Sequence, residues 1–245
     1  MNSNVSTSDV LLWVALPYVS FTILVVGLIL RHRYDNFGWT SRSSELYEKR
    51  ILRIASPLFH YGMLAVVGGH VVGLLIPESF TSSLGLSERQ YHLTAVTAGL
   101  GAGVATIIGL LLLIYRRRTV ASVFAVTTKN DKAMYIFLLG AIVLGVLTTV
   151  LGSGAVGKAH NYRADVSPWF RSIIFLHPKP QLMSGAPLSY RVHVIGALLL
   201  FMIWPFTRLV HALSAPAQYL FRPYVIYRSK DSQGLGNREK QRRGW

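Results

Sequence analysis

Long, uninterrupted blocks of apolar residues constrain this chain more than any other feature of its sequence. Each of five blocks is long enough to cross a bilayer, which takes about 20 residues of helix; they cover residues 10–30, 57–76, 93–115, 133–151 and 187–206. Only 14% of the 245 residues are charged, well below the roughly 25% of a soluble domain. The sequence therefore excludes a soluble globular protein and predicts an all-α integral membrane protein with five transmembrane helices.

Prolines and one serine mark the ends of two of these blocks. Ser56 is suited to cap the second helix, Pro57 to occupy its first position, and Pro77 to end it. The fifth block starts at Pro187 in the same way. We expect its internal Pro205 to kink the helix without ending it, because membrane helices tolerate proline.

The lysines and arginines predict the orientation of the helices. Of the 25 such residues, 19 lie in the connections 31–53 and 116–132 and in the segment from 208 onward, and six lie on the opposite side. Because basic residues concentrate on the cytoplasmic side, we expect the N-terminus outside and the C-terminus in the cytoplasm. The long outer connection contains a short amphipathic stretch, 168–176, that predicts a helix on the outer surface.

The remaining features concern the organisation of the chain. The first apolar block lacks the basic region and the cleavage site of a signal peptide, so we expect it to be retained as a helix. We divide the chain into a membrane domain, residues 1–228, and a polar, basic tail, residues 229–245, that we expect to be disordered. The net charge of +15 is spread over loops between apolar blocks, which predicts membrane lipids and not nucleic acid as the surroundings of the protein.

Four of the eight histidines lie in or at the ends of the apolar blocks. His60 and His70 belong to the second block, and His193 and His211 belong to the fifth block and its end. Ionisable side chains inside a bilayer are costly, so they mark functional sites. The chain contains no cysteine, which excludes Fe–S clusters and thiolate metal sites held by this chain. A redox centre in this chain therefore has to use histidine.

Helix geometry arranges these four histidines in two pairs. At about 1.5 Å per residue, His70 and His193 lie at the same depth, roughly 20 Å above the inner face of the membrane. His60 and His211 form a looser pair, roughly 10 Å apart in height, and five full helical turns separate His193 from His211. The pairs predict two b-type haems between the second and fifth helices, each iron held by one histidine from each helix. The alternatives are interhelical hydrogen bonds or a proton path.

The other histidines carry less information. His32 lies among arginines of the inner side, and His92, His160 and His177 fall on the outer side, where we interpret them as surface residues. His92, at the outer start of the third helix, is kept as a candidate for a quinone site.

The segments around the paired histidines resemble one family, the gamma subunit of the membrane-bound, quinol-linked respiratory nitrate reductase. The resemblance extends from the first helix to about Tyr227, and it rests on RHRYD at 31–35, SPLFH at 56–60, GHVVG at 69–73, RVH at 191–193 and PFTRLVH at 205–211. It implies that His70 and His193 hold the outer haem and that His60 and His211 hold the inner one. It also implies a quinol pocket beside the outer haem, with Arg89 at about the place where the family typically has lysine.

As the resemblance implies, the protein is a membrane-anchor cytochrome b subunit in the cell membrane of a bacterium. Menaquinol or ubiquinol is oxidised near the outer face, and electrons pass through the outer and then the inner haem. The basic inner loops and residues 214–227 are expected to dock an Fe–S beta subunit, which feeds a molybdenum-containing alpha subunit that reduces nitrate. This chain carries no nitrate chemistry of its own.

Two other functions remain open at this point. The first is a gamma-type di-haem cytochrome b of another quinone-linked complex, such as a heterodisulfide-reductase-like or hydrogenase-like enzyme. The second is a cofactor-free transporter or channel in which the histidines relay protons. A reduced b-type absorption band would exclude the second, and the identity of the partner subunits would decide the first.

Overall fold

The structure, a computed structural model, describes residues 6–35, 44–155 and 158–213. In these residues the regular structure is entirely helical, and five helices are long and apolar enough to cross a membrane. They run over Thr7–Tyr34, Leu52–Leu75, Glu88–Thr119, Lys129–Gly152 and Leu188–Phe206. The prediction of an all-helical protein with five such helices is confirmed. The expected tail, 229–245, lies outside the described residues, as does the segment 214–227.

The first long helix has three parts, α1 (Thr7–Val10), the π-helical η1 (Leu11–Ala15) and α2 (Leu16–Tyr34). The Ser6 hydroxyl caps its start by accepting the N–H of Ser8. The wider π turn comes just before Pro17 of α2, where the proline ring would crowd the carbonyl of the preceding turn of a regular helix.

The second long helix comprises α3 (Leu52–His70) and the π-helical η2 (Val71–Leu75), and its start differs from the prediction. Pro57 lies inside α3 and is not its first residue. The cap is the Glu48 carboxylate, which accepts the N–H groups of Ile51 and Leu52 at 2.8 and 3.4 Å. Since Glu48 satisfies these otherwise unpaired donors, the helix begins before the proline.

Glu48 is itself held by Arg116 near the C-terminal end of α5 (Glu88–Thr119). The guanidinium of Arg116 is 2% exposed and donates to the Glu48 carboxylate at 2.6 Å, to the Glu48 carbonyl at 2.7 Å and to the Ser44 hydroxyl and carbonyl at 2.8 Å each. Desolvation acts to raise the pKa of Glu48, but the hydrogen bonds from Ile51, Arg116 and Leu52 outweigh it and hold this pKa below its usual value. The start of α3 is therefore tied to α5.

The third and fourth long helices are both longer than the apolar blocks that predicted them. α5 begins with a capping box of Ser87 and Gln90, and α7 (Lys129–Gly152) begins with one of Thr128 and Asp131. A capping box satisfies the N–H groups of the first turn through polar side chains. Each helix therefore extends into polar sequence that hydropathy alone does not assign to it.

The α-helical part of the fifth long helix ends at Ile203, just before Pro205, so the prediction of a kinked but continuous helix was wrong. α10 (Leu188–Ile203) gives way to two 3-10 segments, η3 (Trp204–Phe206) and η4 (Arg208–Ala212). Thr207 between them is extended, with φ −119° and ψ −178°. The chain therefore changes direction before it reaches His211.

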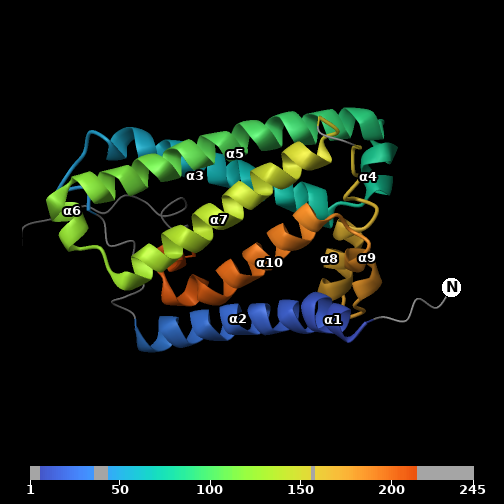
Figure 1. Ribbon diagram of the computed structural model, residues 1–245, viewed down its shortest axis with the longest axis horizontal. Coiled ribbons are helices and arrows are strands. Elements are labelled where there is room, and N and C mark those ends of the chain that lie inside the picture. Colours follow the sequence, from blue (N-terminus) through green and yellow to red (C-terminus); the bar gives the residue numbers. More distant parts are fainter. Residues whose placement is uncertain (1–5, 36–43, 156–157, 214–245) are drawn as a thin grey trace, which may run out of the picture. The chain divides into compact units, whose positions relative to one another are not determined.

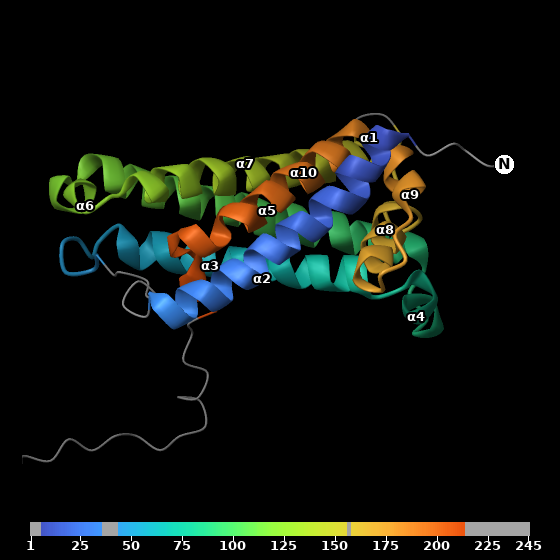
Figure 2. The same ribbon diagram turned by 90° about the horizontal axis from the view of Figure 1, so that it is seen from below.

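The main contacts between the long helices run from α3 to α5, to α7, to α10 and to α2 (Figures 1 and 2). The short helices α4 (Glu78–Ser83), α8 (Val166–Ile174) and α9 (Pro180–Ser184) gather at one end, named the α8 end below. The opposite end, named the η4 end, holds η4 and α6 (Ala121–Ala125). α8 covers most of the predicted surface helix 168–176.

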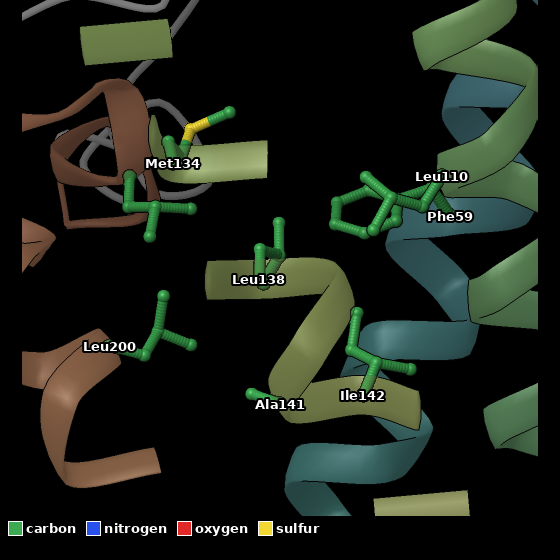
Figure 3. Close-up of a cluster of buried hydrophobic side chains, with 8 residues drawn as sticks. Phe59, Leu110, Met134, Leu138, Ala141, Ile142 and Leu200 are labelled. Carbon is green, nitrogen blue, oxygen red and sulfur yellow. The ribbon is translucent and has the colours of Figure 1, made fainter. Parts of the chain in front are cut away.

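Two clusters of buried apolar side chains hold these helices together. The larger joins α3, α5, α7 and α10 and includes Phe59, Leu110, Leu138 and Leu200 (Figure 3). The smaller lies at the α8 end, where Trp13 packs edge-on against Trp169 at a centroid distance of 6.0 Å. In each long helix, at most 28% of the most apolar window is buried. The remaining apolar surface suits contact with lipid chains.

Candidate functional site: two histidine pairs

The structure brings His70 and His193 together near the α8 end. His70 is the last residue of α3, and His193 lies in the second turn of α10. Their ring centroids are 6.0 Å apart, and the ring planes are inclined by 46°. The π-helical η2 follows His70 directly, and the Gly73 carbonyl of η2 accepts the Ser167 hydroxyl of α8 at 2.7 Å. This pair therefore lies directly beneath the short helices of the α8 end.

The structure also brings His60 and His211 together, near the η4 end. Their ring centroids are 6.0 Å apart and the planes are inclined by 72°. The height difference expected for a straight fifth helix does not separate them. The reason is the turn at Thr207, which redirects η4, so the count of five full turns between His193 and His211 does not describe the chain.

Both distances fit bis-histidine ligation of one iron. Two metal–nitrogen bonds of about 2.0 Å, each extended by the half-width of an imidazole, place the centroids of opposite axial ligands roughly 6 Å apart. Within residues 6–35, 44–155 and 158–213, no group of three or more His, Asp or Glu side chains converges on a point. Two-ligand centres therefore fit the arrangement, and a zinc or copper site with three or four ligands does not.

The Nδ1 atoms of three of these histidines contact backbone carbonyls. His60 contacts Ser56 at 2.7 Å, His70 contacts Val66 at 2.8 Å, and His211 contacts Arg208 at 2.5 Å. A carbonyl can only accept, so Nδ1 carries the hydrogen and donates it. The proton-free Nε2 is then available to a metal, which is the usual arrangement of a ligating histidine.

His193 is held differently, by α7. The Cε1 atom of its ring would lie 3.0 Å from a Cβ atom added to Gly145, so a larger residue at this position would press on the ring. Its Nδ1 is buried without a hydrogen bond of good geometry, and the Ala141 carbonyl is the acceptor with which it interacts. α7 therefore sets the position of a histidine on α10.

The backbone break before His211 is stabilised from α2. Arg31 donates from one guanidinium nitrogen to the Pro205 carbonyl at 2.6 Å and to the Thr207 carbonyl at 3.0 Å. A Cβ atom on Gly27 would lie 2.8 Å from the Pro205 ring, which shows how closely α2 approaches the turn. Carbonyls that lose their helical partners at a proline need such donors inside a membrane protein.

Arg208 links the same turn to α7. Its guanidinium binds the Asp131 carboxylate through Nε at 2.5 Å and Nη2 at 3.0 Å, and its carbonyl accepts Nδ1 of His211. Asp131 is 2% exposed and also caps α7. The planar fork of arginine matches a carboxylate in two places. Arg208 therefore connects the orientation of His211 to the first turn of α7.

We expect Arg208→Gln to disturb the His60/His211 pair selectively. The change leaves the Asp131 carboxylate buried without its partner, which costs about 3–5 kcal/mol in comparable pairs. Bound haem at the His60/His211 pair should fall, while the redox titration of the other pair should stay unchanged. Arg208→Lys should lose less, because it keeps the charge but not the fork. Arg118→Gln, at an exposed arginine of the same end, is the matched control; equal losses in Arg208→Gln and Arg118→Gln would contradict the positioning role.

A group of polar side chains at the α8 end was not predicted from the sequence. His160, expected on the surface, is half-buried, and its Nε2 lies 3.0 Å from the Asp165 carboxylate. The phenols of Tyr91 and Tyr162 are 3.0 Å apart, and the Tyr162 ring stacks on Tyr190. Burial first, and then the Tyr91 phenol, raises the pKa of Tyr162, so that this phenol stays protonated. The spacing of these residues in the sequence gave no sign that they would meet.

The other residues singled out in the sequence lie apart from the histidine pairs. Arg89 is exposed in the first turn of α5, after the cap Ser87. His92, one turn further, lies with its Nε2 3.3 Å from the Ser153 carbonyl. His177 is exposed, and its Nδ1 is 2.8 Å from the Phe175 carbonyl. The structure therefore does not bring Arg89 into either histidine pair.

These observations define a class of helical protein in which the second and fifth of five apolar helices carry two histidine pairs, one towards each end. Sequence comparison narrows this class. Residues 9–230 match the family model described as nitrate reductase gamma subunit. The chain belongs to this family, and the resemblance predicted from its histidine motifs is confirmed.

Several curated proteins are similar to this chain. It is 57% identical over 235 residues to the nitrate reductase-like protein NarX of Mycobacterium tuberculosis, which covers 96% of this chain but 36% of that protein. The chain thus spans about a third of the length of that relative. It is 44% identical over 223 residues to the nitrate reductase gamma chain of Bacillus subtilis, covering 91% and 99% of the two chains. It is 34% identical over 216 residues to the respiratory nitrate reductase 2 gamma chain of Escherichia coli, covering 87% and 94%.

Proposed function

We propose that this chain is the membrane-anchor cytochrome b subunit of a quinol-linked nitrate reductase in a bacterial cell membrane. The observation that carries the proposal is the presence of two histidine pairs, each with ring centroids 6.0 Å apart, at different heights between the same two helices. His70 with His193 would hold one b-type haem, and His60 with His211 would hold the other. When bound, the haems supply one-electron carriers that link the two faces of the membrane.

The orientation of the protein is part of this proposal. The basic connections lie at the η4 end and the α8 end is poor in lysine and arginine, so the η4 end faces the cytoplasm. The α8 end then faces outward, where the protons of quinol are released. The docking face for an Fe–S beta subunit and a molybdenum-containing alpha subunit is the η4 end, which exposes Arg53, Arg118, Lys129 and Lys132.

The residues of this chain would ligate the two irons, orient the ligating histidines and place the quinol. Nε2 of each paired histidine would hold the iron, because Nδ1 contacts or interacts with a backbone carbonyl. Gly145 and the Arg208–Asp131 ion pair hold the two histidines of α10 and η4 in place. Arg89, exposed at the start of α5, is a candidate contact for the head group of quinol.

Haem content and reduction by quinol test this function. Purified chain should give two haems b per polypeptide in a pyridine-haemochrome assay, because four ligands form two pairs. Both haems should be low-spin, since two histidines would hold each iron, and menaquinol or ubiquinol analogues should reduce them. A stoichiometry of one or none would contradict the pairing. Two haems that quinol does not reduce would contradict the quinol-oxidising role.

A further inference from the structure

The stretch of the second long helix that carries His70 is closely packed only at its two ends. At one end Gly62 is buried against α5, where an added Cβ would lie 2.6 Å from the Thr106 hydroxyl oxygen. At the other end Gly73 of η2 is buried. Between them no residue of 63–72 is buried. The position of His70 therefore depends on what holds these two ends.

The end at Gly73 is held by α8. The buried Ser167 hydroxyl donates to the Gly73 carbonyl at 2.7 Å, and Nη1 of Arg171 donates to the Leu74 carbonyl at 2.9 Å. Ser167 and Arg171 are four residues apart, so they lie on one face of α8. The last carbonyls of a helix have no partner within that helix, and η2 ends one residue after Leu74. α8 therefore supplies the donors that this helix end lacks.

Another face of α8 is bound to the first long helix. The Trp169 indole donates to the Trp13 carbonyl of η1 at 2.9 Å, and the Tyr18 phenol of α2 donates to the Ile173 carbonyl at 3.1 Å. Trp169 and Ile173 are also four residues apart, and both are buried. α8 therefore connects η2 to the first long helix and fixes the position of one relative to the other.

Arg171 also brings a positive charge to this place. In the part of the chain that the structure describes, no carboxylate forms an ion pair with Arg171. Burial first, and then the neighbouring Arg163, lower the pKa of Arg171, but an arginine stays protonated in proteins. Leu74, whose carbonyl it binds, is about one turn beyond His70, roughly 6 Å along the helix. A positive charge without a carboxylate partner therefore lies close to the helix end that follows His70.

A haem held by His70 and His193 would respond to both features of α8. Ferric haem carries one more positive charge than ferrous haem, so a nearby cation favours the ferrous form and raises the reduction potential. A unit charge about 10 Å away, at an effective dielectric constant of about 20, changes such an equilibrium by roughly tenfold. The EPR signal of a low-spin haem depends on the angle between its axial imidazole planes, which is 46° for these two rings.

We propose that Ser167 and Arg171 of α8 position His70 and that the charge of Arg171 raises the reduction potential of the haem held by His70 and His193. This inference rests on the proposed haem-carrying function and assigns a role to the connection between the fourth and fifth long helices. Both side chains are positioning residues, because they act on the ligand through η2. The charge acts through space and makes this haem a better electron acceptor.

The charge is tested by optical redox titration of membranes that contain the intact complex. Arg171→Gln keeps a hydrogen-bond donor but removes the charge. At a fixed potential the ferrous-to-ferric ratio of the His70/His193 component should fall about tenfold, which corresponds to about 59 mV for one electron, while the other component stays unchanged. Arg171→Lys keeps the charge and should keep most of the potential. Lys179→Gln, at an exposed lysine of the same connection, is the matched control and should shift neither component. An unshifted potential in Arg171→Gln would overturn the role of the charge.

The positioning is tested without any change of charge. Ser167→Ala leaves the Gly73 carbonyl without its donor, so η2 is held less firmly and the angle between the rings should change. The EPR signal of this haem should therefore shift, and its potential should change less than in Arg171→Gln. Ser184→Ala is the matched control, because the Ser184 hydroxyl donates only to the Pro180 carbonyl of its own helix α9, at 3.1 Å. A Ser167→Ala signal equal to that of wild type would overturn the positioning role.

The remaining outcomes separate this inference from the proposed function. If the wild-type complex has no b-type component that His70→Ala removes, the proposed haem site fails first. If that component is present, its selective loss in Arg171→Gln supports the inference, because the hold on η2 is then needed for ligation. If Arg171→Gln does not accumulate at all, the EPR signal of Ser167→Ala decides whether α8 acts on His70.

Discussion

His70→Ala and His193→Ala are expected to lose the same haem and to abolish quinol oxidation. Each removes one of the two imidazoles that approach to 6.0 Å near the α8 end, and an iron with one axial histidine missing is weakly held. Even groups that only orient a metal ligand cost about 10–100-fold in affinity or activity when they are lost, so the loss of a ligand should cost more. Optical redox titration of membranes should show one b-type component missing in both variants, with the second component retained.

Variants of the His60/His211 pair should lose the other haem. His60→Ala and His211→Ala should each remove the second component, leave the first one reducible by quinol, and block electron transfer to the partner subunits. The four variants thus sort into two classes by spectrum and by the step that fails. If His60→Ala and His70→Ala lost the same component, the assignment of ligands to two separate irons would be wrong.

The helices of this fold could be predicted because bilayer thickness and helix rise are fixed quantities. The five apolar blocks appear as five long helices, and residue counting alone predicted that His70 and His193 would meet, as their rings do. Residue counting could not predict helix ends that are stabilised by side chains distant in the sequence. α3 starts at Leu52 because Glu48, held by Arg116 of another helix, caps it.

The His60/His211 pair and the polar side chains at the α8 end show a second limit. Residue counting assumes a straight helix, whereas the chain turns at Thr207 once Pro205 has ended α10, and carbonyls there are satisfied by Arg31 from α2. His160 and Asp165 lie in a connection without hydrophobic periodicity, so no sequence pattern predicted their contact. Tertiary hydrogen bonds decide such places, and they join residues that are far apart in the sequence or lie in irregular segments.

Gly109→Ala is expected to damage the His60/His211 pair through packing alone. An added Cβ on Gly109 of α5 would lie 2.5 Å from the Phe59 backbone nitrogen and 2.7 Å from its Cα, on the residue next to His60. Backbone atoms cannot rotate away as a side chain does, so α3 and α5 have to separate. Overpacking of this kind costs about 1–3 kcal/mol or more, and the shift would move His60 relative to His211.

Gly101→Ala on the same helix provides the matched control, because an added Cβ there meets nothing within 4 Å. Alanine is the better helix former by about 1 kcal/mol, so this variant should be neutral or slightly stabilised. Thermal unfolding of the haem-loaded chain in detergent and redox titration of both haems measure the difference. Gly109→Ala should unfold at lower temperature and lose the His60/His211 component first, since the added methyl group acts next to that histidine. Equal behaviour of the two variants would mean that close contact of α3 with α5 does not position His60.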